Sequence, residues 1–139
     1  MKTLAIIIAL TLTSFISHAQ DSLQNHTITV KVVNPLNAKG HVLIGLHSSD
    51  TFMKADGIQS AKVKVIDGQA VATFENVKSG NYAVMVVHDE NDNLRMDFEA
   101  NGMPKESYGM SNNPMLMGPP TFNDAKFELK EDSEISIRF

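Results

Sequence analysis

Hydrophobic and polar residues alternate with a period of two along most of the chain after its first twenty residues. This alternation is typical of strands that bury one face, and it recurs in seven short segments with turn residues between most of them. In one segment, Tyr82, Val84, Val86 and His88 share a face. We expect the seven strands at 27–33, 41–48, 61–66, 70–77, 81–88, 125–129 and 135–139.

The same pattern predicts the fold class. No amphipathic helix of convincing length is present, and residues 50–60 have room for one short helical turn. Seven short strands with turns between them predict an all-β, seven-stranded antiparallel β-sandwich. The alternation fails over about 89–124, between the fifth and sixth predicted strands. A loop of that length in a small domain is typically functional, or is held by something other than regular structure.

The N-terminus has the features of a secretory signal peptide over residues 1–19. Lys2 provides the positive charge, the apolar run LAIIIALTLTSFI follows, and Ser17 and Ala19 provide small residues before a cleavage site. We therefore expect an exported protein, periplasmic or secreted, with one domain at 20–139 and no membrane span after cleavage.

Composition limits the classes of partner. The chain has 139 residues, no cysteine, and 12 Lys and Arg against 16 Asp and Glu, for a net charge of −4. An acidic domain lacks the basic face that nucleic acid requires. The predicted partner is an extracytoplasmic ligand or protein, and the pattern specifies neither its identity nor the oligomeric state.

The long loop begins with oxygen-bearing side chains at alternate positions. Counted from Asp89, positions one, three, five and nine match those of a twelve-residue calcium loop, and position seven would provide a backbone carbonyl. The candidate calcium ligands are Asp89, Asn91, Asn93, the Arg95 carbonyl, Asp97 and Glu99. The match is partial, because Leu94 stands where such loops prefer Gly and Glu99 comes before the closing position. Metal-free Asx turns have the same composition, so both interpretations remain open.

Methionine is concentrated in the same half of the chain. Thioethers and imidazole are ligands for reduced copper, which makes a copper site with His88 an alternative hypothesis. Methionine also fills irregular gaps beneath long loops, and that is its commoner role. The methionines concerned are Met85, Met96, Met103, Met110, Met115 and Met117.

An enzyme is the third and weakest hypothesis. A small hydrolase would have to combine His88 and Asp89 with Ser107 or Ser111. None of these residues lies in a nucleophile elbow, and a histidine at a strand end more often bonds into the adjoining loop. We therefore expect a non-enzymatic binding or structural module. The candidate binding-loop residues are His88, Glu106, Tyr108, Ser111, Asn112 and Phe122.

A family resemblance rests on motifs between residues 80 and 125. Its residues are Gly80, Tyr82, Ala83, His88, Asp89, Asn91, Asn93, Asp97, Gly102, Pro104, Glu106, Tyr108, Gly109, Ser111, Asn112, Gly118, Pro119, Pro120, Phe122, Asp124 and Ala125. The chain resembles an exported bacterial family catalogued as domain of unknown function 2141. The family usually has Gly at the position of Leu94. The resemblance implies a β-sandwich related to transthyretin-like or immunoglobulin-like modules, and it implies no activity.

Overall fold

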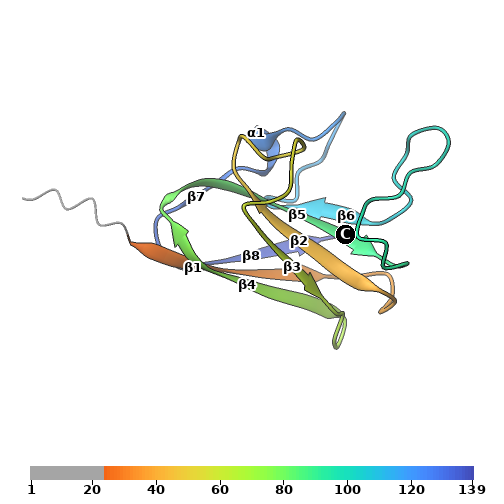
Figure 1. The fold of residues 1–139 in the computed structure, drawn as a ribbon, viewed down its shortest axis with the longest axis horizontal. Coiled ribbons are helices and arrows are strands. Elements are labelled where there is room, and N and C mark those ends of the chain that lie inside the picture. Colours follow the sequence, from red (N-terminus) through yellow and green to blue (C-terminus); the bar gives the residue numbers. More distant parts are fainter. Residues whose placement is uncertain (1–23) are drawn as a thin grey trace, which may run out of the picture.

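The structure, a computed structural model, describes residues 24–139. The predicted signal peptide at 1–19 lies outside these residues. Among the described residues, no helix is long and apolar enough to cross a membrane. The regular elements (Figure 1) are β1 (Asn25–Val33), β2 (His41–His47), β3 (Gln59–Val63), β4 (Gln69–Lys78), β5 (Gly80–Asp89), β6 (Tyr108–Met110), α1 (Phe122–Ala125), β7 (Phe127–Leu129) and β8 (Ser133–Arg138).

The strands form two sheets. One sheet has the order β4-β1-β8 and the other has the order β3-β2-β5-β6, with β7 paired to the start of β5. The all-β prediction is confirmed, and all seven predicted strands are present with shifted ends. Two details of the prediction are wrong. An eighth strand, β6, lies inside the predicted loop, and β1 pairs in parallel with β8. A strand of three residues is too short to show alternation, and alternation does not specify which strand lies beside which.

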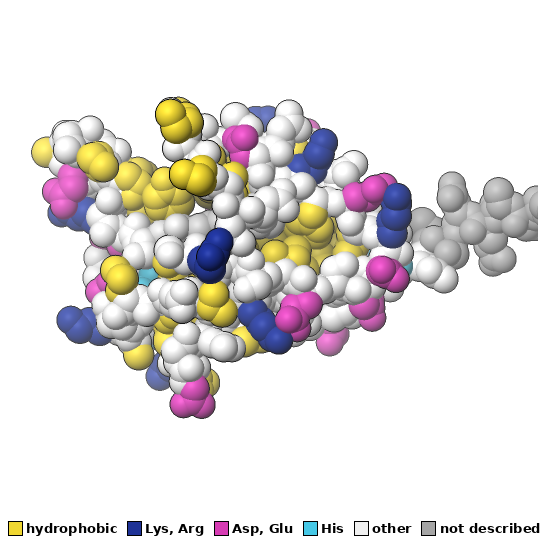
Figure 2. Space-filling model, turned by 180° about the vertical axis from the view of Figure 1, so that it is seen from behind, with side chains coloured by type: hydrophobic (Ala, Val, Ile, Leu, Met, Phe, Trp, Pro, Cys, Tyr) yellow, Lys and Arg dark blue, Asp and Glu magenta, His cyan; other side chains and the backbone are white. Residues whose placement is uncertain are grey.

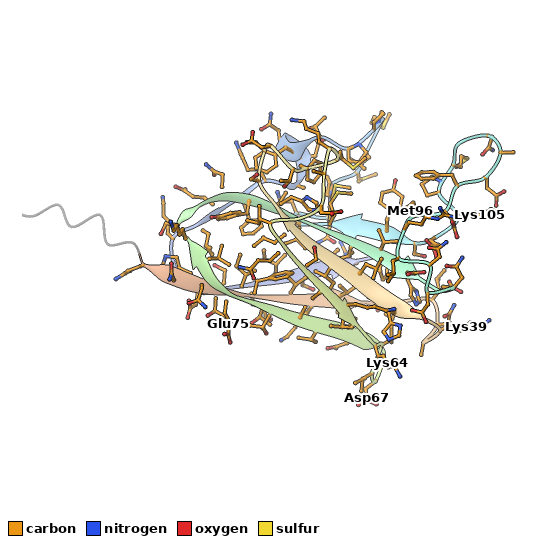
Figure 3. All side chains as sticks on the ribbon, in the orientation of Figure 1. Lys39, Lys64, Asp67, Glu75, Met96 and Lys105 are labelled. Carbon is orange, nitrogen blue, oxygen red and sulfur yellow. The ribbon has the colours of Figure 1, made fainter. Side chains whose placement is uncertain are left out.

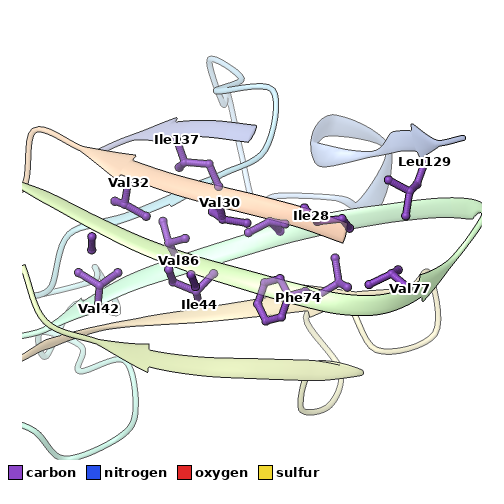
Figure 4. Packing of buried hydrophobic residues seen from close by; sticks show 14 residues of the cluster. Ile28, Val30, Val32, Val42, Ile44, Phe74, Val77, Val86, Leu129 and Ile137 are labelled. Atoms are coloured by element: carbon purple, nitrogen blue, oxygen red, sulfur yellow. The ribbon is translucent and has the colours of Figure 1, made fainter. Parts of the chain in front are cut away.

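The core lies between the two sheets and follows the predicted alternation. Ile28, Val30 and Val32 of β1 have no exposed surface, and neither does Val86 of β5 in the opposite sheet. Figure 4 shows these side chains meeting between the sheets, with Phe74 of β4 among them. Each fully buried side chain of this size contributes roughly 1.5–3 kcal/mol, so the paired inner faces hold the domain together.

A second apolar cluster lies on the outer face of β5 and β6. Phe52 covers this face from the turn after β2, where its N–H donates to the Ser48 carbonyl at 3.0 Å. Phe122 of α1 meets Phe52 edge to face, with 6.0 Å between ring centroids. The buried members of the cluster are Phe52, Ala83, Met110 and Ala125. The outer face of this sheet is therefore apolar and partly covered by loops.

Three consecutive polar residues after β6 fix the rest of the long loop to the sheets. The Ser111 hydroxyl accepts from the Val84 N–H at 2.9 Å and donates to the Ala125 carbonyl. The Asn112 amide donates to the Lys126 carbonyl at 2.9 Å. The Asn113 side chain donates to one backbone group of β8 at 3.0 Å and accepts from another at 2.8 Å. Side-chain hydrogen bonds thus replace regular structure over this segment.

Gly109 in β6 provides the first testable prediction. A Cβ at this position would lie 2.7 Å from the Arg138 carbonyl oxygen and 2.8 Å from Ile137 Cγ2, because β6 packs closely against β8. We expect Gly109→Ala to lower the free energy of unfolding by about 1–3 kcal/mol in urea denaturation. Gly118→Ala is the matched control, since a Cβ there meets nothing within 4 Å. Equal stability of the two variants would contradict this packing.

Candidate functional site

The acidic loop, defined here as residues 89–107, begins with a buried carboxylate. Asp89 ends β5 and has no exposed surface. One of its oxygens accepts from the Asn93 N–H at 3.1 Å, and the other accepts from the Leu94 N–H at 2.8 Å. Because a buried carboxylate needs partners for both oxygens, these bonds fold the chain back sharply over the strand end.

A second carboxylate closes the turn from the other side. The Asn91 amide donates to Asp97 at 2.6 Å, and the Asn93 amide donates to both Asp97 oxygens at 2.9 and 2.8 Å. These amides, with a smaller contribution from the charges of Arg95 and Lys105, hold the pKa of Asp97 below its usual value of 3.8. The Asn91 and Asn93 side-chain oxygens also accept backbone N–H groups two residues ahead, which makes two consecutive Asx turns.

Glu106 joins the two ends of the acidic loop. It is 9% exposed, and its two oxygens accept from the Glu90 and Asp97 N–H groups, each at 3.2 Å. Between Asp97 and Glu106 the chain forms a small hairpin, in which the Lys105 N–H donates to the Asp97 carbonyl at 2.8 Å. Figure 3 shows Met96 and Lys105 on this loop, beyond the strand ends. Three carboxylates therefore organise the whole segment.

An ion-pair cluster fixes the acidic loop to the neighbouring strands. Asp92 contacts His41 of β2, and it lies 3.1 Å from the Lys62 ammonium of β3. Lys62 first, and His41 second, hold the pKa of Asp92 below its usual value of 3.8. These groups are partly exposed, so the cluster orients the loop more than it stabilises the fold.

Apolar side chains project from this ordered backbone into solvent. Leu94 is 63% exposed, Phe98 is 58% exposed and Met103 is 62% exposed. Leu94 also has a positive φ of 66°. The tight turn therefore forms without a Gly at position 94, at a cost of roughly 1–2 kcal/mol for an L-residue in this conformation.

Hydrogen bonds bring together four of the residues predicted as calcium ligands: Asp89, Asn91, Asn93 and Asp97. In this arrangement their carboxylates bond N–H groups, and calcium binding stays a prediction. Both oxygens of Asp89 and of Asp97 already accept N–H groups, and amide nitrogens rather than oxygens face Asp97. Glu99 is exposed, and its N–H donates to the Met103 carbonyl across the hairpin. Among residues 24–139, no group of three or more His, Cys, Asp and Glu is placed to hold a metal ion.

His88 lies between the sheets. It has no exposed surface, its ring stacks on Phe139 at 5.8 Å, and its Nε2 bonds the Lys39 carbonyl at 2.8 Å. Met110 pairs with Met85, whose side chain is on the outer face of β5. Met110 therefore lies on the face of the sheet opposite to His88. His88 and Met110 therefore do not share a site.

The other predicted binding residues have packing or hydrogen-bonding roles. The hydroxyl of Ser111, 1% exposed, is engaged as donor and acceptor, so it is not available as a nucleophile. Asn112 bonds the segment after α1, and Phe122 packs on Phe52, which is the commoner role of such an aromatic. Tyr108 is 37% exposed at the start of β6.

Sequence reasoning missed two features of this region. Asn113 hydrogen-bonds β8 through both the nitrogen and the oxygen of its side-chain amide. Its position directly after Ser111 and Asn112 in the sequence could have indicated this role. His47 is 92% buried on the outer face of β2, since its exposed fraction is 8%. The signal for His47 was Gly45, two residues earlier on the same face of the strand, where the absence of a side chain leaves room for the ring.

The comparisons with known proteins identify a family and no activity. A family model described as "Uncharacterized protein conserved in bacteria (DUF2141)" matches residues 30–137, from within β1 to within β8. No curated protein and no solved structure matches the chain.

Glu106 provides a prediction for the order of the acidic loop. Gln in its place turns one acceptor oxygen into an NH₂ donor that faces a backbone N–H, which should cost about 1–3 kcal/mol. We expect Glu106→Gln to lower the melting temperature and to speed amide exchange at Glu90 and Asp97. Glu99→Gln is the control because Glu99 is exposed. Melts of both variants in EDTA and in calcium distinguish the two interpretations of the loop: coincident curves indicate metal-free Asx turns, and a large calcium-dependent rise indicates an ion in the loop.

Protonation of Asp97 at low pH provides a second prediction for the acidic loop. The pKa of Asp97 is lower in the folded protein than the usual 3.8, so its contribution to stability is complete above that value and is lost as the pH falls through the folded pKa. We expect the side-chain amide NMR signals of Asn91 and Asn93 to shift below about pH 4. The Asn113 amide, which donates to the Ser136 carbonyl, should not shift in the same range. Simultaneous shifts of all three would indicate global unfolding.

Proposed function

The chain belongs to the DUF2141 family of uncharacterized bacterial proteins, and we propose that it is an exported, non-enzymatic recognition module whose acidic loop is the binding surface. The two-sheet fold is of the immunoglobulin-like or transthyretin-like kind in this proposal. Export is supported by the signal-like pattern at 1–19. The ligand is an extracytoplasmic protein or peptide.

One observation carries the proposal: the acidic loop has an ordered backbone from which the apolar side chains of Leu94, Phe98 and Met103 project into solvent. Asp89, Asp97 and Glu106 accept the N–H groups that would otherwise leave the chain free to move. Exposed apolar side chains on such a backbone lose little conformational freedom on binding, which favours affinity. Phe98 is the predicted anchor, because buried aromatic side chains dominate the energetics of protein interfaces.

The surface charge is consistent with a protein ligand. Seen from behind, positive and negative side chains are interspersed around exposed hydrophobic ones (Figure 2). No continuous basic face is visible on that side, which agrees with the net charge of −4. Mixed charges around apolar side chains are typical of the rim of a protein interface.

The geometry favours recognition over hydrolysis and over a copper site at His88. Hydrolysis needs a free nucleophile beside a base, whereas the Ser111 hydroxyl is fully engaged and His88 is enclosed between the sheets. A copper site centred on His88 has the same difficulty, because its ring is stacked on Phe139. Calcium in the loop stays a prediction, and hydrogen bonds account for the order of the loop without it.

Site-specific photocrosslinking in the producing bacterium tests the proposal. A photoreactive residue at position 98 or 103 should give the same discrete adduct in the cell envelope. The control position is Val71, which is 45% exposed on β4 in the other sheet and should give none. Adding Glu106→Gln should weaken the adduct at least several-fold while the protein stays folded. No adduct at 98, or the same adduct at 71, would reject the acidic loop as the binding surface.

A further inference from the structure

A groove crosses the outer face of β2, β3 and β5, on the side of the sheet that faces away from the core. It has a volume of about 600 Å³. Its floor is formed by Leu43 and Gly45 of β2 with Met85 and Val87 of β5, which pair directly across the two strands. The acidic loop forms one wall, and the turn after β2 forms the other. We call this hollow the outer groove.

His47 lies against this groove with a nitrogen that has no partner. Its side chain is 8% exposed, and Nδ1 is buried without a hydrogen bond among the described residues. The Thr51 backbone lies close enough to the ring to oppose the effect of burial on the pKa of His47. Leaving a polar group buried and unpaired costs roughly 1–3 kcal/mol. Among the described residues His47 and His88 each have such a nitrogen, and of the two only His47 borders the outer groove.

The imidazole is oriented by its neighbours. Phe52 contacts the ring edge to face at 6.0 Å between centroids. A Cβ on Gly45 would lie 2.7 Å from His47 Nε2, so the absence of a side chain at 45 allows this nitrogen to lie over the strand. Gly45 is paired with Met85 on β5, so Met85 lies next to the strand position that the His47 ring covers. The Nε2 atom therefore faces the floor of the outer groove.

Three methionines line the same groove as His47, and each comes from a different element. Met85 is on β5, Met53 is in the turn after β2, and Met96 is in the acidic loop. Met53 has a positive φ of 57°, a strained conformation for a residue with a side chain. Such strain is concentrated at binding sites, where the surrounding structure maintains it.

The chemistry of these groups selects a soft metal ion. Thioethers and imidazole favour Cu(I), whereas calcium and magnesium require several oxygens. Burial lowers the pKa of His47, against the opposing effects of the Thr51 backbone and the Asp56 charge, and a lowered pKa favours the neutral imidazole that a metal ion binds. The two cationic side chains that line the groove are each paired with a carboxylate, Lys62 with Asp92 and Arg95 with Asp97.

We propose that the outer groove is a binding site for a single Cu(I) ion, with His47 Nε2, Met85 and at least one of Met53 and Met96 as ligands. The outer groove shares Leu94 with the exposed apolar side chains of the acidic loop, but it does not include Phe98 or Met103, the positions that the crosslinking experiment uses. It also differs in its histidine and its face of the sheet from a copper site at His88. Binding needs no change in oxidation state, because the ion enters and leaves as Cu(I).

Competition with a chromogenic Cu(I) chelator, under ascorbate and without oxygen, tests the site on the full mature chain. We expect one equivalent to bind, and Met85→Leu and His47→Phe each to weaken binding by about tenfold or more. Leu keeps the volume of Met, and Phe keeps the contact with Phe52, so both variants should remain folded. Circular dichroism melts verify this.

Three further measurements distinguish binding in the outer groove from binding at exposed thioethers. Met115→Leu and Met117→Leu should leave the affinity unchanged, since these methionines are 97% and 102% exposed. Gly45→Ala should weaken binding while every ligand is retained, because its Cβ would displace Nε2. With methyl-labelled methionine, Ag(I) should shift the Met85 signal and that of Met53 or Met96, but not those of Met115 and Met117.

The proposal fails if His47→Phe and Met85→Leu bind Cu(I) as tightly as the unmodified chain. It also fails if Met115→Leu weakens binding as much as Met85→Leu, because the ion would then be held by exposed thioethers. Zn(II) tested in the same way should not compete, since borderline ions prefer additional His, Cys or carboxylate ligands. Zn(II) binding as tight as Cu(I) would reject a site selective for soft ions.

Discussion

The burial of Asp89 at the end of β5 is the constraint on which the functional end of the molecule depends. A carboxylate without exposed surface must have its oxygens satisfied within the protein, and the N–H groups of Asn93 and Leu94 satisfy them. These bonds reverse the chain immediately, hold Leu94 at a positive φ of 66°, and bring the following residues back over the sheet. The same reversal directs apolar side chains outward and makes Met96 part of the outer groove. One buried charge therefore positions both proposed binding surfaces.

The two faces of β5 have different roles. Its inner face contributes Val84 and Val86 to the core, and neither has exposed surface. Its outer face carries Met85 between Gly45 on one neighbouring strand and Met110 on the other. Beside Met110 this face is covered by Phe52 and the loops, whereas beside Gly45 it is open. The groove exists because loops close only one half of an apolar sheet face.

Hard and soft donor atoms are separated in this molecule. Both oxygens of Asp89, Asp97 and Glu106 accept N–H groups of the acidic loop itself, so these carboxylates organise its backbone. Among the described residues, the Nδ1 atoms of His47 and His88 are buried without a hydrogen bond, and His47 lies beside the methionines of the outer groove. The hydrogen bonds of the acidic loop account for its order, while the soft donors proposed as ligands lie in a groove that the acidic motif does not indicate.

The sequence by itself determined the strands and their inward faces, because the side chains of a strand alternate between faces and one face is buried. Ile28, Val30, Val32 and Val86 lie in the core for this reason, and the carboxylates and amides of the acidic loop were identified by their spacing. Only the tertiary structure decided which strands are neighbours, including the parallel pair of β1 and β8 and the three-residue β6. It also decided that His88 lies between the sheets and that His47 meets Met85 outside them. Alternation specifies the face of a residue, whereas its neighbours depend on strand pairing between distant segments.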